Sequence, residues 1–299
     1  MKRNLMKRLT ARLLRTPGDV WRVWCLRDLQ RRWPLGWSDS AFSSVPIDVI
    51  IPVAKKDAHL LPPVITSARQ FVRHPIKTVY VVHAHGVDLR HLAQSRDVIL
   101  VPESAVLSPA AQALEYCPRG MNRAGWIRQQ LVKLSGDLLS SSRRYLVLDA
   151  DTVFVRNTVF ETGGREVLYC SDEYYRPYWT TYQKLLGPCR RFHMSFIAHQ
   201  MLFVAEMVVE LRKAIEKQCG AAWDRSIMNA LDPDEISSFS EYETYGNFVW
   251  QTAPNSTEIR YWFNRRVNIP NDWNTDSSAL VESLGKSART VSVNVYLCD

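Results

Sequence analysis

The sequence predicts an α/β protein with a mixed, mainly parallel central sheet flanked by helices. From residue 45 onward, short apolar runs rich in β-branched residues alternate with longer segments of helical periodicity, which is the order of βαβ units. The runs are apolar throughout, as in strands that are buried on both faces. One of them, residues 145–148, ends in the charged pair Asp149 and Asp151. A chain of 299 residues is long enough to bury one large core or two smaller ones.

The first half of the body is predicted to build most of the sheet. The predicted strands are residues 47–53, 77–83, 98–101 and 145–148. A polar turn at residues 55–57 precedes a predicted helix over residues 60–72, and a second, long helix covers residues 121–139. About a hundred residues of α/β structure therefore precede the acidic pair.

The second half is predicted to be less regular. The predicted strands are residues 166–170, 195–203, 261–267 and 291–297, and the predicted helices are residues 206–219 and 238–250. Residues 174–182 are rich in aromatic side chains and fit no regular pattern. They are expected to form a packed lid or, alternatively, a loop whose rings stack on sugar faces.

The positive charge of the chain is concentrated at its N-terminus. The net charge is +8, and residues 1–33 hold ten Lys or Arg against two Asp, whereas the remaining residues carry equal numbers of basic and acidic side chains. A nucleic-acid-binding protein needs a wider basic surface, so no nucleic-acid partner is predicted.

The basic segment has the pattern of a helix that lies in a membrane interface. If residues 2–15 are helical, apolar side chains share one side and basic side chains spread over the opposite one. Four tryptophans follow between arginines, at Trp21, Trp24, Trp33 and Trp37. Trp and Arg together favour the headgroup zone of an anionic membrane. Residues 1–33 are therefore predicted to bind an anionic membrane surface; the alternatives are a basic helix that packs on the body or a partner, and a transit peptide.

These patterns give the predicted domains and location. Residues 1–44 form the membrane-associating arm, and residues 45–299 form a second domain with two halves, 45–154 and 155–299. The sequence has no apolar run of the ~20 residues that span a bilayer and no secretory signal, and its six cysteines are scattered. We expect a cytoplasmic protein, peripheral on the inner face of the cell membrane.

The acidic pair is the strongest indication of chemistry. Asp149 and Asp151 are one residue apart after a buried strand, so their side chains point the same way or converge. Ligands bind at the carboxyl ends of strands in α/β sheets, and two carboxylates there can hold a hard divalent cation. The structural alternative is an Asp that caps the loop after a strand.

Four motifs in their order resemble a known class of enzymes. They are residues 125–134, 148–154, 195–201 and 240–247. Together they resemble the GT-A class of nucleotide-sugar-dependent glycosyltransferases, and more closely a poorly characterised bacterial group with GT-A-like landmarks. The resemblance covers residues 46–267, and it implies a Rossmann-related GT-A-like fold. It also implies that residues 45–299 are a catalytic domain, with 45–154 as the nucleotide-sugar half and 155–299 as the acceptor half.

The resemblance also implies a donor site with Mn²⁺ or Mg²⁺. In that class the acidic pair holds the ion against the donor diphosphate, with Asp151 as a direct ligand and Asp149 nearer the ribose or the metal. The turn that begins at Pro52 and Val53 and ends at Asp57 corresponds to the contact with the nucleotide base.

Two basic residues precede the acidic strand. Arg128 and Lys133 lie on the predicted helix and are candidates for contacts with phosphate oxygens. A solvated helix face is the alternative for each of them.

Three further residues are candidates for the reaction itself. In inverting enzymes of the class, an acid near the start of a late helix accepts the acceptor proton, and Glu241, with Glu243 second, has this position. Acids also favour the first turn of a helix through its dipole, which is the structural alternative. His199 is a candidate metal ligand or acceptor contact, or else a hydrogen-bonded core residue. No histidine follows His199, so a third metal ligand near the C-terminus is absent or replaced.

The motifs and the resemblance together predict a metal-dependent glycosyltransferase that acts on a bacterial surface glycan or glycolipid, and Glu241 as base would make it inverting. One competing hypothesis is a haloacid-dehalogenase-like phosphatase with Asp149 as nucleophile, although that motif normally opens its domain. A nucleotidyltransferase and a non-enzymatic membrane adaptor are the others. The first lacks its glycine-rich phosphate loop here, and the second leaves the acidic pair unexplained.

Overall fold

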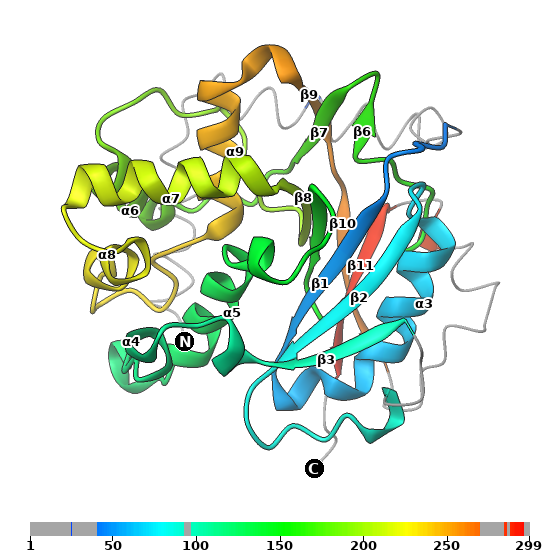
Figure 1. Cartoon of the computed structure of the whole chain (residues 1–299), viewed down its shortest axis with the longest axis horizontal. Coiled ribbons are helices and arrows are strands. Elements are labelled where there is room, and N and C mark those ends of the chain that lie inside the picture. Colours follow the sequence, from blue (N-terminus) through cyan, green and yellow to red (C-terminus); the bar gives the residue numbers. More distant parts are fainter. Residues whose placement is uncertain (1–24, 26–40, 93–96, 270–283, 286–287, 296–299) are drawn as a thin grey trace.

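The computed structural model describes residue 25 and residues 41–92, 97–269, 284–285 and 288–295. Within these residues the central sheet has five strands in the order β3-β2-β1-β4-β8 (Figure 1). Their bounds are β1 Ile47–Val53, β2 Ile76–His83, β3 Val98–Pro102, β4 Arg144–Leu148 and β8 Gln200–Val204. All neighbours are parallel except β8, which runs antiparallel to β4. The predicted mixed, mainly parallel α/β sheet is therefore confirmed.

The sheet is buried on both faces because its strands are apolar on both sides. Along β1, Ile47, Val49 and Ile51 pack on one face, and Ile50 packs on the other. The core on the face of Ile47, Val49 and Ile51 also contains side chains of α3 (Leu61–Phe71). The core on the face of Ile50 contains side chains of α5 (Ala124–Lys133), α7 (Ala205–Cys219) and α9 (Glu241–Thr252). Figure 1 shows α3 on one side of the sheet and the group α6 to α9 on the other.

The order in which the chain adds strands to the sheet reverses at β1. From β1 the chain proceeds to β2 and β3 at one edge, and it then returns to place β4 on the other side of β1. The carboxyl ends of β1 and β4 consequently lie next to each other, at the switch point where open α/β sheets bind ligands. Since β8 is antiparallel and Gln200 pairs with Leu148, the residue before β8, His199, lies at the same end.

Two smaller sheets complete the strands of the described chain. They comprise β10-β11-β5 and β6-β7-β9, with bounds β5 Thr152–Phe154, β6 Glu161–Thr162, β7 Arg165–Cys170, β9 Thr257–Tyr261, β10 Asn264–Ile269 and β11 Thr290–Val295. The strand predicted over residues 261–267 is thus two strands, because the chain passes from one small sheet to the other at Trp262, which is fully buried.

The segment predicted as a strand or strand-turn over residues 195–203 is a strand only from Gln200 onward. Two helical segments also differ from the prediction. The helix predicted over residues 121–139 is shorter: α5 ends at Lys133, and a 3-10 turn at Gly136–Leu138 follows. A β-carbon at Gly136 would overlap the ring of Tyr145, so this close approach fixes the chain there. Residues 174–182, predicted as irregular, enter the helix α6 (Arg176–Leu186), which buries Tyr182 and Leu185.

The remaining elements are short. They are α8 (Trp223–Ala230), α4 (Pro109–Gln112) and the 3-10 helices η2 Lys55–Leu60, η3 Arg90–Leu92, η4 Glu103–Ala105, η5 Pro118–Gly120 and η7 Pro254–Ser256. None of the helices in the described ranges is long and apolar enough to cross a membrane. The predicted arm, residues 1–33, lies outside the described residues except for Cys25, so its amphipathic helix and its membrane contact stay predictions.

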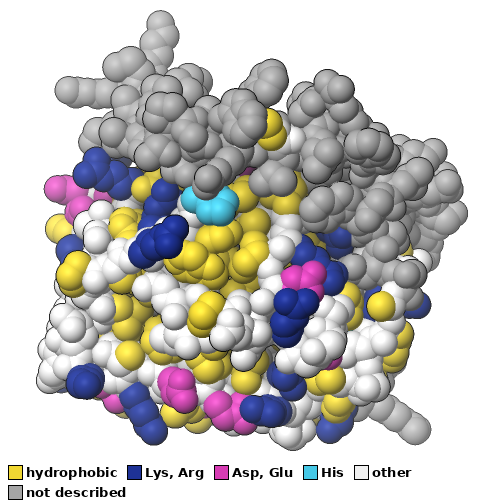
Figure 2. All heavy atoms as spheres, turned by 90° about the horizontal axis from the view of Figure 1, so that it is seen from above, with side chains coloured by type: hydrophobic (Ala, Val, Ile, Leu, Met, Phe, Trp, Pro, Cys, Tyr) yellow, Lys and Arg dark blue, Asp and Glu magenta, His cyan; other side chains and the backbone are white. Residues whose placement is uncertain are grey.

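Figure 2 shows the molecule from the top of Figure 1. Hydrophobic side chains gather in the middle of this face, and Lys and Arg side chains lie beside them. Apolar surface bordered by polar groups is common where a protein contacts a ligand or a partner.

Candidate active site

The acidic pair lies in a tight turn between two strands. β4 ends at Leu148, and the amide of Thr152 donates to the carbonyl of Asp149 over 3.1 Å before β5 begins. The amide of Asp149 donates to the carbonyl of His199 (3.1 Å), and Val293 of β11 donates to the carbonyl of Asp151 (2.8 Å). Backbone hydrogen bonds to two neighbouring strands or their ends therefore fix both acids at the switch point.

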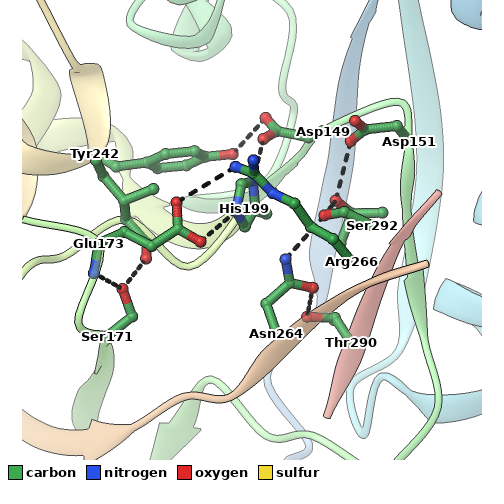
Figure 3. Close-up of polar contacts among 12 residues, drawn as sticks. Asp149, Asp151, Ser171, Glu173, His199, Tyr242, Asn264, Arg266, Thr290 and Ser292 are labelled. Carbon is green, nitrogen blue, oxygen red and sulfur yellow. Dashed lines mark hydrogen bonds and ion pairs between the residues drawn. The ribbon is translucent and has the colours of Figure 1, made fainter. Parts of the chain in front are cut away.

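The Asp149 carboxylate is surrounded by three donors (Figure 3). Its Oδ1 accepts from Lys133 Nζ (2.5 Å) and from the Tyr242 hydroxyl (2.9 Å), and its Oδ2 lies 3.1 Å from His199 Nδ1. Burial alone would raise the pKa of this carboxyl, but Lys133 and then His199 hold the pKa well below its ordinary value. Asp149 is thus an ionised anchor with both oxygens engaged.

Lys133 is a buried cation shared by two carboxylates. Its Nζ lies 2.5 Å from Asp149 and 2.6 Å from Glu241 Oε1, with side-chain exposures of 8% for Lys133 and 3% for Glu241. Burial would lower the pKa of Lys133, yet the charges of Asp149 and Glu241 raise it overall. The ring of Tyr242 lies beneath the ammonium at 4.3 Å. The structure therefore places Lys133 inside the protein rather than on a solvated helix face.

His199 joins the acidic pair to a third carboxylate. Its Nε2 lies 3.0 Å from Glu173 Oε1, while Nδ1 faces Asp149. Burial would lower the pKa of His199, but the hydrogen bonds to Asp149 and Glu173 raise it to about 10. Both ring nitrogens face carboxylate oxygens, so the ring is an imidazolium that donates through both. A metal-binding role for His199 stays a prediction. The backbone of His199 has φ 61°, a left-handed conformation that is costly for a residue other than glycine and is often found at functional sites.

Glu173 occupies the rim of the site on the loop after β7. Its amide donates to Ser171 Oγ (3.1 Å), and the Ser171 hydroxyl donates to the carbonyl of Ile197 (2.5 Å). Arg266 of β10 approaches Glu173 Oε2 to 3.8 Å (Figure 3). Glu173 thus connects the β7 end, the segment before β8 and β10.

Asp151 and Asp57 have less positive charge around them than Asp149. Burial, then the charge of Asp149, raises the pKa of Asp151, whose carboxylate accepts from the Thr152 hydroxyl (3.2 Å). Burial also raises the pKa of Asp57; Lys56 lowers it, and the charge of Asp151 raises it again. Asp57 lies in η2, which follows the end of β1, and its charge and that of the acidic pair oppose each other.

A divalent cation fits this donor set only with help from a ligand. In the part of the chain that the structure describes, no three His, Cys, Asp or Glu side chains are grouped to hold a metal ion by themselves. Mg²⁺ is often bound by one or two carboxylates and completes its coordination with water and substrate phosphates. Asp151 and Asp57 suit that role because burial, the largest cause, raises the pKa of each carboxyl, and a bound cation would stabilise their charged forms.

The structure brings most of the predicted site residues together. Contacts or charge effects connect Asp57, Lys133, Asp149, Asp151, His199 and Glu241. Pro52 and Val53 are buried in the last positions of β1, directly before the turn to Asp57.

Two predicted residues have partners elsewhere. Arg128 Nε lies 3.1 Å from Glu103 Oε1. Glu243 is buried and accepts from Asn247 Nδ2 (3.0 Å), and burial raises its pKa although Ser195 lowers it. Nothing in these contacts tests the functional roles of the predicted residues, which stay predictions.

The sequence interpretation missed Glu173, Tyr242 and Arg266 as members of the site. A signal existed for Glu173, because it closely follows a predicted strand, as the acidic pair does. Tyr242 lies between the two candidate acids of α9. The sequence analysis included it in the motif at residues 240–247 but assigned it no role. Nothing in the pattern around Arg266 indicates a site.

The fold and the site define an α/β protein with an acidic cluster at the switch point of a mainly parallel sheet. Within this class, the chain belongs to the family described as a family of unknown function, DUF6492, which matches residues 46–278. A search of the curated proteins finds no match.

Among solved structures, the chain is similar to mouse xyloside xylosyltransferase 1 in its apo form. The TM-score is 0.43 and the sequence identity 13%, over 85% of this chain and 98% of that one. Identity this low says nothing about the reaction of the present protein.

Proposed function

We propose that the protein is a metal-dependent glycosyltransferase, which moves a sugar from a nucleotide-diphosphate donor to a hydroxyl of an acceptor glycan or glycolipid. One observation carries the proposal: Asp149 and Asp151 follow the carboxyl end of β4, next to the end of β1, and Asp57 follows β1 in η2, beside the switch point. Carboxylates in this place suit a ligand that brings a diphosphate and its divalent cation.

The three acids would have different functions. Bound Mn²⁺ or Mg²⁺ would neutralise the charge that develops on the departing diphosphate. Asp151, with Asp57 beside it, would hold the ion. Asp149 would fix the turn that carries Asp151, because Lys133 and His199 already neutralise it.

The donor nucleoside would lie at the end of β1. Pro52 and Val53 are buried, so the base would contact their main chain and the turn to Asp57 rather than their side chains. A phosphate contact by Arg128 would require its ion pair with Glu103 to open.

The acceptor and the location rest on the N-terminal sequence. Ten basic residues with interspersed tryptophans in residues 1–33 suit an anionic membrane surface. We therefore propose a peripheral protein on the inner face of a bacterial cell membrane, with a surface glycan or glycolipid as acceptor.

The first experiment is a titration of thermal stability with UDP, GDP and CMP, with and without Mn²⁺. A ligand that binds only the folded state at 100 times its Kd adds about 2.7 kcal/mol, or roughly 5 to 10 °C in Tm. We expect a Mn²⁺-dependent rise with one diphosphate that is lost in Asp151→Ala. No rise with any nucleotide, together with hydrolysis of p-nitrophenyl phosphate, would contradict the transferase and favour the phosphatase.

The contacts of Asp149 argue against the phosphatase. A nucleophilic carboxylate needs one oxygen directed at phosphorus. Both oxygens of Asp149 face donors, namely Lys133 and Tyr242 on one side and His199 on the other.

A further inference from the structure

A nucleotide-diphosphate donor, together with the carboxylate that holds its divalent cation, carries more negative charge than the ion supplies. A cationic side chain that reaches the phosphate oxygens would balance the remainder. We propose that this side chain is Arg266 of β10, which binds the donor diphosphate from the side of the small sheet β10-β11-β5. The inference rests on the proposed glycosyl transfer and adds a residue that binds its donor.

The two basic residues predicted for the phosphate contact already have carboxylate partners. Lys133 is 8% exposed and lies between Asp149 and Glu241, so its ammonium is closed off from a phosphate. Arg128 is 21% exposed, and its Nε lies 3.1 Å from Glu103. A phosphate contact with either residue would therefore break an existing ion pair.

Arg266 rises from the face of the small sheet that adjoins the acidic turn. It pairs in register with Ser292 of β11, and Ser292 pairs with Thr152 of β5, the residue after Asp151. The hydroxyls of Ser292 and Thr152 lie 3.3 Å apart, so they share a face. Asn264, two residues before Arg266 and therefore on the same face, donates to Ser292 Oγ over 2.9 Å. Since neighbouring strands lie about 4.8 Å apart, the main chain of Arg266 is roughly 10 Å from that of Thr152, a gap that a long side chain and a diphosphate can bridge.

The tip of Arg266 makes a second connection to the acidic turn. Its Nη2 lies 3.8 Å from Glu173 Oε2. Glu173 Oε1 is in turn 3.0 Å from His199, whose Nδ1 is 3.1 Å from Asp149. Figure 3 shows the Arg266 side chain directed from β10 toward Glu173 and Asp149. Two routes, one through the small sheet and one through Glu173 and His199, thus place the guanidinium beside the turn that carries Asp151.

The guanidinium has donors to offer to a phosphate. The side chain is 67% exposed, and among the described residues Glu173 is its one charged or hydrogen-bonding partner. Exposed ion pairs contribute little to stability, so a phosphate can share or replace this contact at small cost. A guanidinium carries five N–H donors in a planar fork that matches phosphate oxygens. Glu173 consequently directs Arg266 toward the site while most of the fork stays available.

The test measures binding of UDP and GDP by isothermal titration calorimetry, with Mn²⁺ present, in the wild type, Arg266→Gln and Arg265→Gln. The control removes the same charge from the preceding residue of β10, which pairs with the buried Val291 and so points to the opposite face. We expect Arg266→Gln to weaken binding of the diphosphate that the wild type binds by about 10- to 100-fold, the range of hydrogen bonds to charged groups. Arg265→Gln should keep an affinity close to that of the wild type. Arg266→Gln should also keep the wild-type Tm, because its ion pair is exposed.

A third variant separates the positive charge from the shape of the side chain. Arg266→Lys keeps the charge but loses the planar fork, so its affinity should lie between those of the wild type and Arg266→Gln.

Three results would overturn the inference. The first is an unchanged affinity of Arg266→Gln, as expected if Arg266 contacts only the acceptor. The others are an equal loss in Arg265→Gln and equal weakening in Arg266→Lys and Arg266→Gln. A wild type that binds neither diphosphate contradicts the proposed function and removes the inference with it, so the two failures are distinguishable.

Discussion

Replacement of Lys133 with methionine removes the cation that two buried carboxylates share. Lys133 lies 2.5 Å from Asp149 and 2.6 Å from Glu241, at side-chain exposures of 8%, 24% and 3%. Methionine keeps the apolar stem but leaves Glu241 without its ammonium, while Asp149 retains His199. Breaking a buried pair by removing one partner costs about 3 to 5 kcal/mol. For a chain of this size the loss corresponds to a fall of roughly 6 to 20 °C in Tm.

The double variant Lys133→Met, Glu241→Gln identifies the cause. If the orphaned carboxylate is responsible, removal of its charge should recover about 1 kcal/mol or more relative to the sum of the single effects. The assay is equilibrium unfolding in urea of the wild type, both single variants and the double variant. A loss below about 1 kcal/mol in Lys133→Met, well under the usual cost of breaking a buried pair, would refute this account of the site's electrostatics.

The remaining predictions concern stability and the buried acid Glu166. Burial raises the pKa of Glu166 to about 8, although Arg144 and Tyr245 oppose the shift, so the folded state binds its proton more tightly than the unfolded state. Stability should then fall as pH rises from about 4.5 to 8, by at most about 1.4 kcal/mol per pH unit. Urea unfolding from pH 5 to 9 should show a flatter profile for Glu166→Gln, and identical profiles would contradict the shift. Gly136→Ala should cost about 1 to 3 kcal/mol because its β-carbon would overlap Tyr145. Gly125→Ala in α5 has room and should be neutral or stabilising by up to about 1 kcal/mol, so an equal loss in the two alanine variants would exclude overlap as the cause.

The sheet was predictable because each of its strands is a short apolar run that can be recognised from neighbouring residues alone. The run at residues 47–53 is apolar on both faces, and β1 has the predicted bounds. The helix α6 was not predicted because aromatic residues occur on several sides of it. The periodicity of its buried residues Thr181, Tyr182 and Leu185 is therefore hard to recognise in the sequence. The early end of α5 was not predicted because apolar residues continue at helical spacing to Leu138, whereas in the structure Gly136 lies against Tyr145 of β4.

The site was predictable only in part, for the same reason. The strand tip at Asp149 and Asp151 is a local pattern, and the structure places it at the switch point as expected. The ion pair of Lys133 with Glu241 joins residues far apart in the chain, so no spacing predicts it. Glu173 reaches the site because β7 ends beside the segment that precedes β8.

Direct binding of Mn²⁺, followed by electron paramagnetic resonance with and without UDP or GDP, tests the central claim most directly. The account predicts that one diphosphate tightens Mn²⁺ binding in the wild type, because no three His, Cys, Asp or Glu side chains among the described residues are grouped to hold the ion by themselves. The same titration of Asp151→Ala should show no such tightening. Binding that is equally tight without nucleotide, or unchanged in Asp151→Ala, would contradict a diphosphate-assisted metal site at the end of β4.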